Sequence, residues 1–471
     1  MSTTKVTGMM QTSTKGGDIS SASPTVIDTD GDYFDVTGTT NFAAFTVVAG
    51  RRFTVQFDGV LTMTHDATNL DLPGGANITT AAGDVAEFFA TGTNTVQCVN
   101  YTKADGTAIV AGASGDLRNY ILDGGMTQFP EGDKTGGGTA GTYGPALWSI
   151  NDTSTAVWTL EQSTDIPTYA ESGHQGKYSF KALITTADAS LAVSDYSLLH
   201  YVVTGTDYAD LHGGKNVTMR FWAKFDADGS SSTSAPYSFS VSIFNSALNR
   251  SYVKELSMAA DDDWQKFEFT FPTDTTGTWL FTEADKGMRI GICMGAGSNY
   301  HGTDETWEGA RDYSTSNQEN LMDYAGNAFY LTQVGLYIGD SAPTFVGEPV
   351  SVIRQQVYYY VEPINMDQGG YLMNTAVLST TNARGTLPFS VQKRTNDSSF
   401  LATGTPATDW RIRHQATITA LSVVPALNAM DRYSASVACT VASGLTAGDS
   451  AVIHEAGADD NAPLILIDDR H

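Results

Sequence analysis

Apolar and polar side chains alternate through residues 52–65, which read RFTVQFDGVLTMTH. The apolar set is Phe53, Val55, Phe57, Leu61 and Met63, and Thr, Gln and Asp residues stand between its members. A period of two places successive side chains on opposite faces of an extended chain. The stretch therefore predicts a β-strand region with one buried and one wet face.

The same alternation returns in residues 217–225 (VTMRFWAKF), 237–243 (YSFSVSI), 266–271 (KFEFTF) and 432–441 (RYSASVACTV). Turn clusters such as DGD at 30–32 and PGG at 73–75 separate such runs, while helical periodicity is almost absent. Many short strands without intervening helices are typical of sandwiches and jelly rolls. We therefore predict an all-β fold of tandem antiparallel β-sandwich or jelly-roll domains.

Shifts in composition divide the chain into five parts. Residues 1–19 form a polar segment that we expect to serve attachment, and residues 20–116 form a small Thr- and Gly-rich β module. Residues 117–349 contain six of the seven tryptophans and have the size of a jelly roll with decorated loops. Residues 350–361 form a connector, and residues 362–471 are predicted to fold as a C-terminal β-sandwich knob.

Charge excludes two classes of partner. The 471 residues include 52 acidic and 26 basic side chains, for a formal net charge of −26. Nucleic-acid binding and docking on anionic lipid both depend on an excess of cations. We therefore expect neither a nucleic-acid partner nor a membrane partner.

Cysteine usage and the amino terminus bear on the compartment. Cys98, Cys293 and Cys439 are odd in number and far apart, so we expect buried free thiols and no disulfide framework. The first 23 residues lack an apolar stretch of signal-peptide length, yet the composition is typical of proteins outside cells. A virion component, made in the host cytoplasm and released by lysis, reconciles the two observations.

Five ordered phrases in the first block resemble a small β module that recurs in tailed-phage fibre and tail proteins. They are residues 32–40 (DYFDVTGTT), 57–62 (FDGVLT), 69–78 (NLDLPGGANI), 81–86 (AAGDVA) and 97–106 (QCVNYTKADG). The middle block resembles the carbohydrate-binding-module-like jelly roll of the same class of proteins. Its matching phrases are residues 119–126 (NYILDGGM), 214–224 (GKNVTMRFWAK), 263–266 (DWQK), 275–280 (TTGTWL) and 329–339 (FYLTQVGLYIG).

The connector and the last block carry weaker likenesses. Residues 354–360 resemble the Gln-Arg-Tyr-Tyr phrase that often follows such a jelly roll, except that Val357 replaces an expected Arg or Cys. Residues 385–393 and 445–448 resemble a terminal fibre knob. Together the resemblances imply a virion structural protein, a tail fibre or related appendage. The family's usual assembly is an elongated homotrimer that contacts other virion proteins and the polysaccharide of the host surface.

Catalytic and metal-binding motifs are missing from the sequence. No HExxH, GxSxG, P-loop, GxGxxG or CxxC pattern occurs, and no pair among the 52 acidic residues stands out for glycoside cleavage. We therefore predict binding without catalysis and no metal site or cofactor. The DTDGD string at 28–32 and the DADG string at 226–229 leave open a calcium ion held by a loop, although both lack the terminal glutamate of an EF-hand.

Sugar recognition requires aromatic faces and planar polar side chains. Residues 295–326 concentrate both with almost no aliphatic residues; the candidates there are Tyr300, His301, Asp304, Trp307, Arg311, Tyr313 and Asn317. A contact between chains of a trimer is the alternative role for this loop. Trp222 is a further candidate, because it stands on the polar phase of its strand, although core packing would also explain it.

Three consecutive tyrosines follow the connector's arginine. On a single chain these tyrosines would leave an apolar patch. We therefore expect contacts about a three-fold axis from Arg354, Tyr358, Tyr359 and Tyr360. Two other functions stay open. One is a head-fibre, decoration or baseplate protein without a glycan ligand, and the other is a polysaccharide depolymerase.

Overall fold

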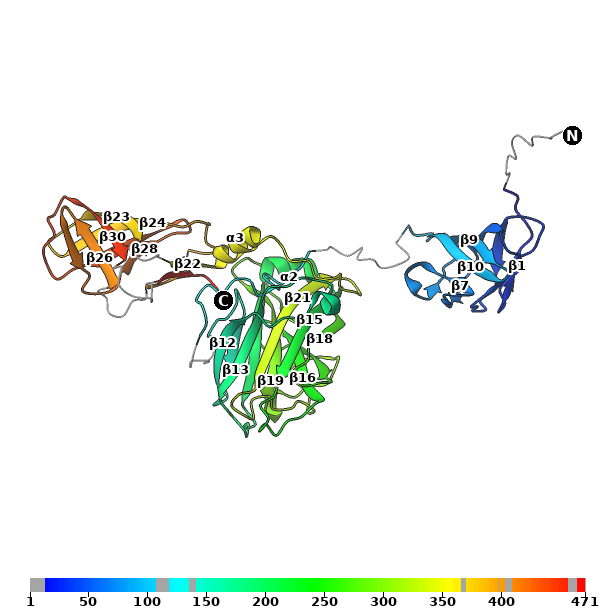
Figure 1. Ribbon diagram of the computed structural model, residues 1–471, viewed down its shortest axis with the longest axis horizontal. Coiled ribbons are helices and arrows are strands. Elements are labelled where there is room, and N and C mark those ends of the chain that lie inside the picture. Colours follow the sequence, from blue (N-terminus) through cyan, green and yellow to red (C-terminus); the bar gives the residue numbers. More distant parts are fainter. Residues whose placement is uncertain are drawn as a thin grey trace, which may run out of the picture. The chain divides into compact units, whose positions relative to one another are not determined.

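The computed structural model describes residues 13–106, 118–134, 141–365, 370–396, 398–402, 409–455 and 464–470 (Figure 1). The chain divides into two compact units, Met1–Ser114 and Gly115–His471. Strands dominate both units, which confirms the all-β fold class. Residues 1–12 of the predicted attachment segment lie outside the described residues.

The first unit contains one six-stranded sheet and two small two-stranded sheets. The large sheet has the order β1(Ile19–Ser20), β3(Tyr33–Thr37), β5(Arg52–Phe57), β9(Val85–Gly92), β10(Thr95–Thr102) and β7(Leu70–Asp71). The small sheets pair β2(Thr25–Val26) with β4(Phe45–Thr46) and β6(Thr62–Met63) with β8(Ile78–Thr79), and a single 3-10 turn, η1(Pro73–Gly75), precedes β8.

Phenylalanine rings fill the core of this first unit. Phe45 contacts Phe42, Phe53 and Phe88 edge to face at centroid distances of 4.9 to 5.4 Å. The alternation in residues 52–57 does place Phe53, Val55 and Phe57 inside. Pairing direction is not encoded in that alternation: β1 with β3 and β3 with β5 are parallel, alongside the antiparallel pairs that were predicted.

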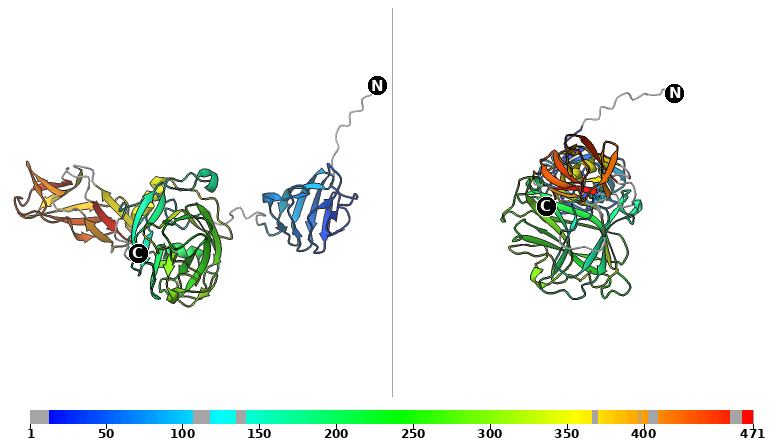
Figure 2. Two further views of the ribbon diagram at one scale, coloured as in Figure 1. Left: turned by 60° about the horizontal axis from the view of Figure 1, so that its bottom comes forward. Right: turned by 90° about the vertical axis from the view of Figure 1, so that its left-hand side faces the viewer.

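A jelly roll of two antiparallel sheets forms the larger part of the second unit (Figure 2). The six-stranded sheet has the order β11(Ser149–Asp152), β14(Tyr196–Thr204), β19(Lys286–Ala296), β16(Tyr237–Phe244), β17(Ser251–Met258) and β20(Trp307–Glu308). The five-stranded sheet has the order β12(Val157–Ser163), β13(Ser179–Thr186), β21(Ala328–Ile338), β15(Asn216–Asp226) and β18(Gln265–Pro272). Three short turns of helix decorate the loops, namely α1(Tyr169–Ser172), α2(Gly205–Leu211) and η2(Ser298–Tyr300).

The inner faces of these two sheets share one apolar core. Phe221 and Phe267 stack across neighbouring strands at 5.3 Å, and Phe239 from the opposite sheet meets Phe267 edge to face at 5.2 Å. The alternation predicted for residues 217–225, 237–243 and 266–271 is thus the alternation between core and outer face.

The C-terminal part is a second sandwich with its own core. A three-stranded sheet, β22(Val361–Asn365), β31(Leu464–Asp468) and β25(Ser399–Ala402), accompanies a seven-stranded sheet. The order of the latter is β27(Thr417–Ala420), β26(Trp410–His414), β30(Ser450–Glu455), β23(Tyr371–Val377), β24(Asn382–Pro388), β29(Ser434–Thr440) and β28(Ala426–Met430).

The connector is a helix, α3(Val350–Tyr360), which the sequence analysis did not predict. Ile353, Val357 and Tyr360 are its buried residues, at the spacing of one helical face. Tyr360 joins the jelly-roll core, while Ile353 and Val357 pack with Leu466 of the C-terminal sandwich. The helix therefore ties both parts of the second unit together.

Three sequence predictions concern thiols, membranes and metals. Cys98, Cys293 and Cys439 are free and buried, and burial raises the pKa of each to about 12. Among the described residues, none of the helices has the length and apolarity needed to span a bilayer. The same residues contain no group of three or more His, Cys, Asp or Glu side chains placed to hold a metal ion.

Candidate functional site

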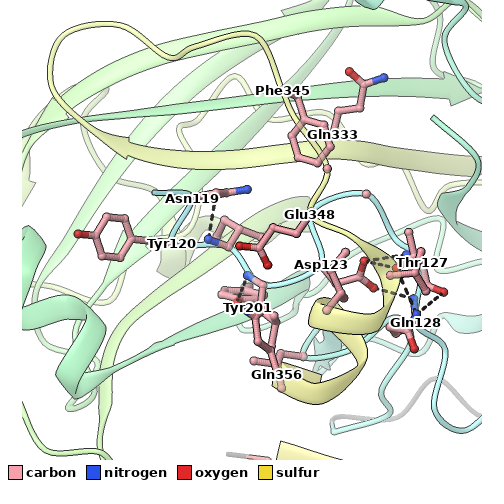
Figure 3. A pocket seen from close by; sticks show the side chains of 18 of the residues that line it. Asn119, Tyr120, Asp123, Thr127, Gln128, Tyr201, Gln333, Phe345, Glu348 and Gln356 are labelled. Carbon is pink, nitrogen blue, oxygen red and sulfur yellow. Dashed lines mark hydrogen bonds between the residues drawn. The ribbon is translucent and has the colours of Figure 1, made fainter. Parts of the chain in front are cut away.

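A cavity of about 730 Å³ lies in the jelly roll, between the start of the domain and helix α3 (Figure 3). Residues 118–125, Thr127 and Gln128 form one wall, residues 174–178, 345–348 and Val350 form others, and Gln333 on β21 and Gln356 on α3 also line it. Its size falls within the range of small-ligand sites in proteins.

The first wall is hydrogen-bonded to strand β21. The Asn119 side chain donates to the Val334 carbonyl at 3.0 Å and accepts from the Leu336 amide at 3.0 Å. Gly124 approaches β21 so closely that a Cβ atom there would lie 1.9 Å from the Val334 oxygen. Glycine is therefore required at this position by the close backbone approach.

A tight turn follows, organised by Asp123. Its buried carboxylate accepts from the Thr127 amide and hydroxyl, both at 2.8 Å, and from the Gln128 amide at 2.7 Å (Figure 3). Burial raises the pKa of Asp123 to about 6, and these hydrogen bonds limit that rise. Because the carboxylate is fully engaged in the turn, it holds the wall in place and is not free for acid–base chemistry.

Gln333 marks an irregularity in β21. Pairing with β15 is interrupted between Arg220 and Trp222, and Gln333 has a left-handed φ of +51°. Its amide nitrogen donates to the Ser172 hydroxyl at 3.1 Å, and its buried Oε1 has no partner among the described residues. Bulges and strained backbones of this kind cluster at binding sites.

The third wall comes from the segment before α3 and from the helix itself. Phe345 is buried against the His174 ring at 5.1 Å. Val346 and Val350 are exposed by 78% and 49%, so the rim of the cavity is apolar as well as polar. The exposed side chains of Glu348, Arg354 and Gln356 complete this wall.

Amide side chains dominate the chemistry of the lining. Five of the 14 glutamines of the chain are there, together with one asparagine and several aromatic rings: Gln128, Gln162, Gln175, Gln333, Gln356, Asn119, Tyr120, Tyr178, Tyr201 and Tyr359. An amide both donates and accepts, which matches the hydroxyls of a sugar, while aromatic rings match its apolar face. The NH2 groups of Asn119, Gln128 and Gln162 already donate to carbonyls of the chain, whereas Gln356 on α3 is exposed. The arrangement suits the reversible binding of a polyhydroxylated ligand.

None of these residues was predicted to bind a glycan; Arg354 and Tyr359, which also line the cavity, were predicted to form trimer contacts. The lining residues come from segments more than 200 residues apart, so no local pattern collects them. The one local signal is in residues 329–339, where Thr332 and Gln333 are consecutive polar residues that break the alternation.

Of the loop candidates, Tyr300, Arg311 and Tyr313 lie together, joined by Tyr196, which the sequence analysis missed. Arg311 donates to the hydroxyls of Tyr313 and Tyr196 at 2.6 and 2.7 Å and lies over all three tyrosine rings at 5.0 to 5.4 Å. Tyr313 is fully buried, so its ring offers no face to a ligand.

The other loop candidates also have partners within the chain. Asp304 accepts from the Glu255 amide, Asn317 donates to the Glu255 carboxylate, and the His301 ring contacts the Ala296 carbonyl at 3.1 Å. Half-buried Trp307 donates to the Pro272 carbonyl at 2.7 Å. The loop is thus a self-satisfied ordered structure, and it is not part of the cavity.

Trp222 and the tyrosine run lie elsewhere. Trp222 is on the outer face of the five-stranded sheet and is only 7% exposed. The loop candidates adjoin the six-stranded sheet, so the structure does not bring Trp222 together with them. Tyr358 and Tyr359 are half-buried on α3, and Tyr360 packs into the core of its own chain. The open tyrosine patch on which the trimer-contact prediction depends is therefore largely covered within one chain.

No protein-family model matches this chain, and no curated protein matches it. Among solved structures, the chain is similar to a CBM4 protein at 14% identity and a TM-score of 0.26, over 46% of this chain and all of the other. It is also similar to TmCBM61 in complex with β-1,4-galactotriose, at 13% identity and a TM-score of 0.23, over 47% of this chain and 99% of that one. A third similarity is to the tandem CBM22-1–CBM22-2 domain of Paenibacillus barcinonensis Xyn10C, at 12% identity and a TM-score of 0.22, over 76% of this chain and 98% of that one. Scores this low carry no inference about ligands.

Proposed function

We propose that this protein is a bacteriophage tail fibre or related virion appendage whose jelly roll binds a host-surface glycan in the glutamine-rich cavity, without bond cleavage. The observation that carries the proposal is the lining of that cavity, in which amides, tyrosines and exposed aliphatic side chains surround about 730 Å³. Such a combination supplies both hydrogen bonds and apolar contacts to a saccharide.

The virion assignment is supported by the sequence phrases that resemble phage fibre modules, in residues 32–106 and 119–339. A homotrimer and contacts with other virion proteins belong to the same proposal. Several weak sites on one particle would then act together, because linked sites raise the effective concentration of each. Mass spectrometry of purified phage particles tests the location, and absence of the chain from the particles would contradict the virion assignment. Sedimentation velocity of the pure chain tests the assembly, and a monomer at micromolar concentration would contradict the homotrimer.

Two neighbouring glutamines on α3 provide a direct test of the site. Gln356 and Gln355 are both exposed, but only Gln356 lines the cavity. We expect the full chain to bind a subset of a bacterial glycan array, Gln356→Ala to weaken that binding at least fivefold, and Gln355→Ala to leave it within twofold. Equal binding by the two variants would remove the cavity as the site, and release of reducing sugar would favour a depolymerase.

A further inference from the structure

A second feature, on the outer face of the six-stranded sheet, is a pair of cations without carboxylate partners. Lys286 and Arg289 both belong to β19, and neither forms an ion pair with a carboxylate among the described residues. Acidic side chains outnumber basic ones twofold in this chain, so a close pair of cations left without an acidic neighbour is unexpected.

The position of Arg289 follows from the strand register. Met288 and Ile290 on either side of it point into the core, so Arg289 points outward. Its cross-strand neighbours are Val202 on β14 and Phe244 on β16, and its guanidinium lies 5.6 Å from the Phe244 ring centre. The Arg289 Nε atom is buried and makes no hydrogen bond to any described residue.

A third cation, Arg394, lies near Lys286. Burial, Arg289 and Arg394 lower the pKa of Lys286, and no carboxylate acts against them. Arg394 donates to the Asp469 and Glu283 carbonyl groups and forms an ion pair with the Asp469 carboxylate at 3.5 Å, so its own charge is compensated. A half-buried pair of like charges without compensation destabilises the free protein, and such arrangements are typical of functional sites.

Buried polar groups lie on the same sheet face, next to Arg289 along the strand. Ser242 and His200 pair with Gly291, two residues beyond Arg289. His200 lies near the Ser149 hydroxyl at 3.4 Å and stacks on Phe244 at 5.9 Å. The Leu198 side chain covers Gly291, and Ser242, His200 and Phe244 are buried, so these groups form the packed floor beside the guanidinium.

We propose that Lys286 and Arg289 form an anion subsite for the carboxylate, sulfate or phosphate substituent of an acidic saccharide, separate from the glutamine-rich cavity. A guanidinium matches the geometry of such oxyanions, and the ammonium group adds a second charge. The Phe244 and Tyr313 rings beside Arg289 are buried, so the subsite recognises the charged substituent and offers no aromatic face to the sugar ring. The subsite stands on its own observations and does not require the cavity to bind a glycan.

Calorimetric titration of the full chain tests the subsite, with glucuronate, glucose 6-sulfate, inorganic sulfate and glucose as probes. We expect the two acidic sugars to bind, neutral glucose not to bind there, and Arg289→Gln to weaken acidic-sugar binding at least tenfold. Arg384→Gln, which removes an exposed cation from β24, is the matched control and leaves binding within twofold.

Three further measurements decide between the outcomes. Lys286→Arg keeps the charge and is expected to bind within threefold of the wild type, whereas Lys286→Gln is not. Gln356→Ala, which alters only the cavity, leaves acidic-sugar binding at this subsite unchanged.

Thermal unfolding checks that the variant is folded. Because the repulsion between Lys286 and residue 289 is relieved, Arg289→Gln unfolds at or above the wild-type midpoint temperature. It also loses the upward shift of that midpoint which glucuronate causes in the wild type. Binding of inorganic sulfate alone, or equal acidic-sugar affinity in Arg289→Gln, would overturn the proposal.

Discussion

The Lys393 ammonium group donates a hydrogen bond to the Glu362 carboxylate over 2.5 Å, and their side chains are 0% and 3% exposed. Lys393 also donates to the Tyr358 carbonyl, near the end of helix α3. The pair therefore joins α3 to the C-terminal sandwich at a point where neither charge reaches water. Burial lowers the pKa of Lys393, and the Glu362 carboxylate opposes that shift.

Removing one partner of this pair is expected to be costly. Lys393→Met leaves the Glu362 charge buried without compensation, which destabilises proteins by about 3 to 5 kcal/mol. Differential scanning calorimetry should show the transition of the second unit moved downward. The double variant Lys393→Met with Glu362→Leu removes both charges and should recover most of the loss; a double variant as unstable as the single one would contradict this account.

Gly124 supports a prediction about the cavity wall. Gly124→Ala places a methyl group against the Val334 carbonyl, which must move. Overpacking of this kind costs about 1 to 3 kcal/mol, and here it also displaces residues 119–124 from β21. Urea unfolding and glycan binding should both be impaired. Gly229→Ala is the control, because no atom lies within 4 Å of a Cβ there, and it should change neither measurement.

Asp274 predicts a specific dependence of stability on pH. Burial alone would raise the pKa of Asp274. The Arg250 guanidinium donates to both of its carboxylate oxygens at 2.6 and 3.0 Å, and the Gly277 amide donates to it as well. These hydrogen bonds hold the pKa of Asp274 well below its usual value. A carboxyl group whose folded pKa is depressed stabilises the protein above its unfolded pKa of about 3.9, and this stabilisation is lost as pH falls toward the folded pKa.

The measurement compares the wild type with Asp274→Asn between pH 2 and pH 7. At pH 7 the variant should be less stable by about 3 kcal/mol, because the half-buried Arg250 loses the counter-charge of the buried Asp274. The difference should shrink progressively below about pH 4, where the unfolded wild type takes up a proton. A difference that is constant with pH would show that packing, and not charge, explains the effect of the substitution.

Much of the fold could be predicted from alternation, because every long strand that was identified has one face on a core. The direction of pairing could not, since β3 and β5 alternate in the same way whether parallel or antiparallel. Helix α3 was missed because its sequence, VSVIRQQVYYY, is rich in β-branched and aromatic residues of low helix propensity. Its spacing of Ile353, Val357 and Tyr360 becomes meaningful only once both neighbouring cores exist.

The candidate sites were less accessible to sequence reasoning. The loop of residues 295–326 has a sugar-binding composition, but its Arg311 is engaged by Tyr196, 115 residues away. Conversely, the cavity is assembled from segments that look ordinary one by one, such as residues 119–126 and the amides of α3. Composition identifies residues capable of recognition, whereas long-range contacts decide which of them remain available.

Two valines on α3 allow a prediction about the rim of the cavity. Val350 and Val352 are both exposed, by 49% and 39%, but only Val350 lines the cavity. Val350→Lys replaces apolar rim surface by a hydrated ammonium group, so the affinity for a bound neutral glycan should fall at least fivefold. Val352→Lys should change it less than twofold. Unfolding midpoints within 2 °C of the wild type would establish that both variants are folded.

The net charge of −26 predicts how binding of an acidic glycan should respond to salt. At long range the protein repels an anionic polysaccharide, whereas Lys286 and Arg289 attract its substituents only at short range. Screening acts first on distant charges, since the Debye length falls from about 30 Å at 0.01 M to about 8 Å at 0.15 M. The association rate constant measured by surface plasmon resonance should therefore rise between 10 and 150 mM NaCl, opposite to ordinary electrostatic steering. The Arg289→Gln variant should keep this rise in association rate, and its complex should dissociate faster, because only the short-range contact has been lost. An association rate constant that falls steadily with added salt would contradict this account, because it would show that the protein surface as a whole attracts the anion.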